Sequence, residues 1–117
     1  MLHTETIALQ WLAAFNAHDL EALLSLYDDD ALHYSPKLKL RMPETNGYIR
    51  GKEALRTWWA DAFERLPGLQ YVLTSVTADE RSVFMEYTRK LPGEADMMVA
   101  EVLEIDKKIA ASRVYHG

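Results

Sequence analysis

Apolar residues in the first part of the chain recur with the spacing of a helix. One stripe, which predicts a helix over about residues 4–16, is made of Ile7, Trp11, Ala14, Phe15 and His18. The polar residues that follow interrupt this stripe, and Asp19 is placed to cap a second helix by accepting from its free amides. The apolar side of that second helix is expected to extend to Tyr27.

Three aspartates at 28–30 are expected to end the second helix, and residues 31–35 then predict one short strand. Residues 36–51 contain two prolines and two glycines without a clear period, which favours a long loop or flap. A third helix is predicted over about residues 52–66. Its stripe, the clearest helical pattern in the chain, is made of Leu55, Trp58, Trp59, Ala62, Phe63 and Leu66.

The second half of the chain alternates apolar and polar residues, as strands do. Four runs separated by short turns lie at residues 70–78, 82–90, 97–106 and 109–116. Short connections favour antiparallel neighbours, so these runs predict a meander. The whole chain therefore predicts one α+β domain over residues 1–117, with three helices packed on one face of a curved antiparallel sheet. Such a cone-shaped arrangement can enclose an internal pocket.

Composition removes several classes of function. Thirteen Lys and Arg residues against 18 Asp and Glu residues give a net charge of −5, without the basic cluster that a nucleic-acid groove needs. The absence of cysteine excludes disulfides, thiolate metal sites and a cysteine nucleophile. The N-terminal stretch lacks a basic region, carries Glu5 and is too short to span a bilayer, so we expect a cytoplasmic protein without a membrane partner.

Known cofactor and metal motifs are also missing. The four histidines are scattered, with no HxH or HExxH spacing, and the aspartates at 28–30 lack the later ligands of a calcium loop. The sequence has no GxGxxG run, no phosphate-binding loop and no GxSxG motif. We therefore expect neither a metal nor a cofactor.

One acidic residue interrupts an otherwise apolar stripe. Alternation in the run 97–106 places Glu101 on the same face as Val99 and Leu103. A carboxyl group on an apolar wall either takes a partner or becomes neutral. Arg89, which has the same parity on the adjacent strand, is the expected partner. The pair is either a structural ion pair, or a general acid at Glu101 with Arg89 orienting a ligand.

Other residues complete a hypothetical site. His33 is the expected base, because it is the only plausible neutral-pH base near the loop 36–51, and Tyr87 would orient the ligand together with Arg89. Aromatic residues at helical spacing are usually core, but some of them are expected to line a pocket. The expected ligand-binding residues are Trp11, Phe15, Tyr27, Ser35, Trp58, Trp59, Met85, Val99 and His116.

The order of these elements and three sequence runs resemble the nuclear transport factor 2-like superfamily, and within it the SnoaL-like, polyketide-cyclase-like branch. The runs are HDLEALLSLYDDDA at 18–31, GKEAL at 51–55 and IAASRVYHG at 109–117, and the match covers nearly the whole chain. The resemblance implies a cone-shaped fold with a pocket and homodimers paired through the outer sheet face. Members include ketosteroid isomerases, epoxide hydrolases, dehydratases, polyketide cyclases and proteins that only bind ligands.

Of three site residues of the ketosteroid isomerases, this chain matches one. The aspartate base that precedes the proline after the first strand is replaced by Ser35, and the tyrosine of the first helix is replaced by Trp11. The protonated acid of the penultimate strand is matched by Glu101. The resemblance therefore implies a related chemistry rather than steroid isomerisation, and the Arg–Asp pair of the epoxide hydrolases is not clearly matched.

Three functions stay open at this point. The first is a cofactor-independent enzyme of isomerase, hydrolase or cyclase type that acts on a largely apolar small molecule. The second is a non-catalytic binding module with the same pocket, and the third is an interaction dimer with a filled core. Pocket volume separates the third from the others, because a ligand site usually encloses roughly 300 Å³ or more.

Overall fold

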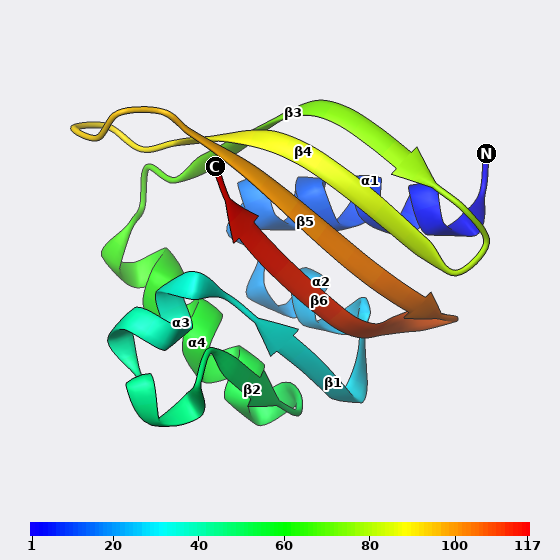
Figure 1. Ribbon diagram of the computed structural model, residues 1–117, viewed down its shortest axis with the longest axis horizontal. Coiled ribbons are helices and arrows are strands. Elements are labelled where there is room, and N and C mark those ends of the chain that lie inside the picture. Colours follow the sequence, from blue (N-terminus) through cyan, green and yellow to red (C-terminus); the bar gives the residue numbers. More distant parts are fainter.

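Helices cover one face of a single curved sheet in the computed structural model, which describes residues 1–117 (Figure 1). The helices are α1 (His3–Asn16), α2 (Leu20–Ser25), α3 (Pro36–Arg41) and α4 (Lys52–Arg65), with a 3₁₀ turn at Pro43–Thr45. The strands are β1 (Tyr27–Tyr34), β2 (Tyr48–Arg50), β3 (Gln70–Ala78), β4 (Ser82–Lys90), β5 (Met97–Asp106) and β6 (Lys108–His116). The predicted α+β class and curved sheet are confirmed, with four helices instead of three.

The sheet is mixed, whereas the sequence pattern predicts an antiparallel one. Its strand order is β2-β1-β6-β5-β4-β3, and β3 to β6 form the predicted antiparallel meander. β1 and β6 are parallel, with His33 beside Ser112. Strands so far apart in the sequence are not linked by a tight turn, so the alternation within each of them carries no information about their pairing.

The second helix is shorter than predicted. α2 ends at Ser25, and Tyr27 is the first residue of β1 instead of the last of the helix. The aspartates at 28–30 belong to the same strand, at an irregularity in its pairing with β6, and their side chains are partly or fully exposed. A strand that bulges at its start can hold three charges in water while Tyr27 stays fully buried.

The predicted loop 36–51 is folded. It contains α3, the 3₁₀ turn and β2, which pairs with β1 in antiparallel fashion. The Ser35 hydroxyl caps α3 by accepting from the amide of Lys37 at 3.2 Å, and Pro36 occupies the first turn, where its missing amide costs nothing. Gly47 has φ +91°, and a Cβ there would lie 2.6 Å from the Tyr34 ring. The segment therefore packs against β1.

The apolar core lies between the concave face of the sheet and α1, α2 and α4. Its fully buried members include Leu23, Tyr27, Leu55, Leu103 and Ile109. None of the helices combines the length and hydropathy needed to cross a lipid bilayer.

Candidate functional site

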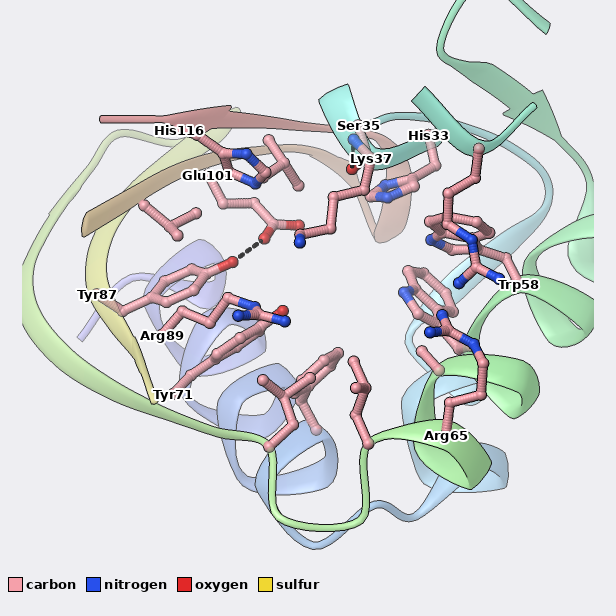
Figure 2. A pocket seen from close by; sticks show the side chains of 18 of the residues that line it. His33, Ser35, Lys37, Trp58, Arg65, Tyr71, Tyr87, Arg89, Glu101 and His116 are labelled. Carbon is pink, nitrogen blue, oxygen red and sulfur yellow. Dashed lines mark hydrogen bonds between the residues drawn. The ribbon is translucent and has the colours of Figure 1, made fainter. Parts of the chain in front are cut away.

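A cavity of about 180 Å³ lies between the concave face of the sheet and helices α1, α3 and α4 (Figure 2). It is open at one side and is therefore not a filled core, although it is smaller than the roughly 300 Å³ of typical ligand sites. Most of the expected site residues line it. These are Trp11, Phe15, His33, Ser35, Trp58, Trp59, Tyr87, Arg89, Val99, Glu101 and His116.

Two expected ligand-binding residues do not line the cavity. Tyr27 is completely buried beneath it, between Trp11 and Trp59. Met85 is also buried, and in the sheet it lies directly opposite Glu101. Both support the cavity wall without reaching its surface.

Glu101 occupies the wall of the cavity with one carboxyl oxygen unpaired. The residue is 1% exposed, and its Oε1 accepts a hydrogen bond of 2.7 Å from the Tyr87 hydroxyl. Its Oε2 is buried and has no hydrogen-bond partner. Burial raises the pKa of Glu101 to about 8, against a smaller opposite effect of the Tyr87 hydrogen bond. At neutral pH the carboxyl group is therefore protonated and has an O–H to donate from Oε2.

The expected ion pair between Arg89 and Glu101 is not formed. The Arg89 guanidinium donates instead to Glu94, at 2.9 Å from Nη1 to Oε1. The strand register explains the difference, because Glu101 lies opposite Met85, four positions from Arg89 along β4. Four residues of a strand span about 13 Å, so shared parity does not bring the two charges together.

A chain of buried hydrogen bonds runs from α1 to His33. The Trp11 indole donates to the Tyr27 hydroxyl at 3.0 Å, and Tyr27 donates to the Ser112 hydroxyl at 3.4 Å. Ser112 lies 2.6 Å from Nδ1 of His33. The Trp11 indole can only donate, so the Tyr27 hydroxyl accepts from it and donates to Ser112. Nδ1 of His33 is then the one acceptor within reach of the buried Ser112 hydroxyl proton, which assigns an unprotonated Nδ1.

His33 is therefore neutral and carries its ring proton on Nε2. Burial lowers its pKa to about 4, and no charged group counteracts this effect. Nε2 forms no hydrogen bond within the protein, and the ring lines the cavity (Figure 2). The arrangement makes His33 a donor toward the cavity, in contrast to the base that its position in the sequence suggests.

Aromatic rings form the apolar side of the cavity. Tyr71 stacks on Phe15 and on Tyr87, with ring centroids 4.2 Å apart in both pairs. Trp58 lies under the Arg41 guanidinium at 5.9 Å, and Trp59 packs on His33 at 5.2 Å. Tyr71 was absent from the expected site, although the alternation within residues 70–78 places it on the inner face.

Sequence reasoning missed three cations of the cavity: Lys37, Arg41 and Arg65. The first two lie on α3, within the segment predicted as a loop. No helical or strand period in that segment indicated which side chains face the cavity. Arg65 is the last residue of α4, and it shares the Asp61 carboxylate with Arg41 at 2.8 and 3.4 Å. No set of three or more His, Asp or Glu side chains lies close enough to hold a metal ion.

Comparison with known proteins agrees with this architecture. The sequence model of the SnoaL-like domain matches residues 8–111. No curated protein matches the sequence. A SnoaL-like protein of unknown function from Burkholderia thailandensis E264 has 27% identity and a TM-score of 0.87, with 97% of this chain and 93% of that one covered.

Two more distant structures share the fold. A candidate ketosteroid isomerase from Kribbella flavida has 18% identity and a TM-score of 0.78, covering 97% of this chain and 77% of that one. A candidate polyketide cyclase from Sinorhizobium meliloti has 17% identity and a TM-score of 0.77, covering 94% of each chain. At these identities the similarity concerns architecture, and chemistry has to be argued from the residues of the cavity.

Proposed function

The chain belongs to the SnoaL-like domain family, and on this premise we propose that it is a cofactor-independent enzyme acting on a small molecule in the cavity. The observation that carries the proposal is the buried, unpartnered Oε2 of Glu101. A buried polar atom without a partner costs free energy, and such a cost is often found where a ligand completes the hydrogen bond. A protonated carboxyl group at this place donates to an oxygen of the ligand.

The role of Glu101 follows from the charge that develops during reaction. In isomerisation, hydrolysis and cyclisation of carbonyl compounds, an oxygen atom gains negative charge in the transition state. A neutral hydrogen-bond donor that is held in place and shielded from water stabilises that charge without reorganisation of solvent. Nε2–H of His33 is a second donor on the same cavity, and Tyr87 holds the Glu101 carboxyl group in place.

The proton acceptor in this proposal is His116. Its ring lines the cavity and forms no hydrogen bond within the protein, and its pKa is lowered by burial and by the nearby charges of Lys37 and Arg89. A neutral imidazole with a free nitrogen can accept a proton near pH 7. His33 does not supply this function, because its unprotonated nitrogen is already bonded to Ser112.

The volume of the cavity supports a ligand of about one ring. An apolar cavity of roughly 150 Å³ accommodates benzene, and the present one measures about 180 Å³. A four-ring steroid would extend far outside it. The size agrees with the replacement of two isomerase residues by Ser35 and Trp11.

The experiment that tests the proposal starts from a thermal-shift screen of small carbonyl compounds, epoxides and aromatic compounds. Each stabilising compound is incubated with the protein, and its conversion is followed by NMR. We expect Glu101→Gln to retain at least a tenth of the rate, because the amide still donates, and Glu101→Leu to lose about 100-fold or more. Equal rates in the three proteins would remove Glu101 from the mechanism.

A binding module without turnover is the second candidate function. It is favoured by the position of Ser35, which stands where the isomerases carry an aspartate base and instead caps α3. In this case stabilising compounds come back unchanged after long incubation. Glu101→Leu then weakens their binding.

A further inference from the structure

Positive charge is concentrated around the cavity of an otherwise acidic chain. Four cations line it, namely Lys37, Arg41, Arg65 and Arg89, whereas the whole chain has 13 Lys and Arg against 18 Asp and Glu residues. The two acids of the lining are Glu94 and Glu101. Since Glu101 is neutral at pH 7, Glu94 is the only charged acid of the lining, and outside the lining Asp61 pairs with Arg41 and Arg65.

Arg89 is a buried cation with unused hydrogen-bonding capacity. Its side chain is 5% exposed, and its only side-chain partner is Glu94, through Nη1. A guanidinium group has five N–H donors, so several of them remain for a group in the cavity. Figure 2 shows the guanidinium turned toward the cavity from β4.

Lys37 reaches the cavity from α3, and Figure 2 shows its ammonium group turned into the cavity. Its ammonium group forms neither an ion pair nor a hydrogen bond with the protein, whereas Arg41 and Arg65 are both neutralised in part by Asp61. Desolvation and the charge of Arg89 lower the pKa of Lys37 more than the charge of Glu94 raises it, so Lys37 and Arg89 are near enough to repel each other. An anion between them relieves this repulsion.

We propose that the site takes a carboxylate of about one ring in size. Its anionic group lies between Arg89 and Lys37, and an oxygen at its other end accepts from Glu101. Arg41 and Arg65 at the cavity mouth add a positive field that attracts such an anion. The inference rests on the proposed function for the role of Glu101, and it replaces the expected largely apolar ligand by one with a charged end.

The test compares benzoate with benzamide, which has the same ring and a neutral head group. Titration calorimetry of the intact protein at low salt is expected to show at least ten-fold tighter binding of benzoate, a preference that falls as ionic strength rises. Arg89→Met and Lys37→Met should each weaken benzoate about ten-fold and leave benzamide within two-fold. Lys39→Met removes an exposed charge from the same helix and is the matched control.

The outcomes separate this inference from the proposed function. The absence of a preference for benzoate in the wild-type protein overturns the inference, whether both probes bind equally or neither binds. An equal loss in Lys39→Met and Lys37→Met also overturns it, because the effect would then be one of net charge. A different outcome is that the protein converts neutral compounds in a reaction that depends on Glu101 and yet shows no preference for benzoate. That result retains the proposed function and rejects only the anionic ligand.

Discussion

Glu101 and His33 respond in opposite directions to the same physical cause. Burial disfavours the charged form of each, so the pKa of the acid rises to about 8 and that of the imidazole falls to about 4. Both groups are consequently neutral at pH 7, and both point a proton at the cavity. Two neutral donors on one wall suit a ligand oxygen better than a structural ion pair would.

The pKa of Glu101 predicts how stability depends on pH. Between pH 6.5 and 8 the folded protein keeps a proton on Glu101 that the unfolded chain has lost, so the free energy of unfolding falls as pH rises, by at most about 1.4 kcal/mol per pH unit. Between pH 4 and 6.5 His33 acts in the opposite direction, so that its contribution to the free energy of unfolding rises with pH. In this range His33 is protonated in the unfolded chain and neutral in the folded protein, where its pKa is about 4.

Urea unfolding at several values between pH 6.5 and 8 measures this slope. We expect the decline in the wild-type protein and its absence in Glu101→Gln, whose amide does not titrate. Parallel curves for the two proteins would show that Glu101 is already ionised at pH 6.5. The same buffers with His33→Gln provide the control, because that variant should retain the decline above pH 6.5.

Among the elements, α1 and β3 are joined by the amide side chains of Asn16 and Gln70, and Gln70 donates to the Asn16 carbonyl at 2.9 Å. Asn16, at the end of α1, donates to the Tyr71 carbonyl and accepts from the Tyr71 amide, both at 2.8 Å. The connection continues the edge of the sheet, since β3 has no strand on its outer side. It also fixes Tyr71, whose ring forms part of the cavity wall.

Removal of this connection should be costly. Asn16→Ala leaves the amide and the carbonyl of Tyr71 without partners in a half-buried place, and we expect a loss of about 2 kcal/mol in the free energy of unfolding. Gln10→Ala, at an exposed position of the same helix, should change it by less than about 0.5 kcal/mol. Similar values for the two variants in chemical denaturation would contradict the role of Asn16.

The segment 36–51 shows why an element can be invisible in the sequence. α3 has six residues and β2 has three, and both are too short to display a period. Their stability comes from contacts that only the fold supplies, such as the pairing of Ile49 with His33 in β1. This segment closes one side of the cavity and supplies Lys37 and Arg41.

At the scale of the whole molecule, the outer face of the sheet carries exposed apolar side chains. Val72, Phe84, Met98 and Tyr115 are 39–69% exposed and come from the four strands of the meander. As the resemblance implies, we propose that a second copy of the chain covers this face. Burial of such side chains in a dimer is favourable at roughly 25 cal/mol per Å².

Light scattering tests this proposal directly. The wild-type protein is expected to have twice the 13.4 kDa mass of one chain at micromolar concentration. Met98→Lys, which places a charge at the most exposed of these four side chains, should shift the mass toward one chain. Leu40→Lys, at an exposed position on α3, is the control and should leave it unchanged. A monomeric wild-type protein at 100 μM would reject the dimer.

Local patterns in the sequence determined much of this protein. The helical stripe of residues 52–66, the alternation of the four C-terminal strands and the single acid at Glu101 are properties of neighbouring residues, and the structure retains them. Burial of Glu101 follows from the same alternation, because a strand buried on one face buries every second residue. These features need no knowledge of distant parts of the chain.

Only the tertiary structure decided which of these residues form hydrogen bonds with one another. Strand register, set by the turns of the meander, gave Glu101 a hydroxyl partner in place of Arg89. The parallel contact of β1 with β6 brought Ser112 to His33 and thereby selected the protonated nitrogen of its ring. Both depend on pairings between residues 14 and 79 positions apart, and a one-dimensional period contains no information about such contacts.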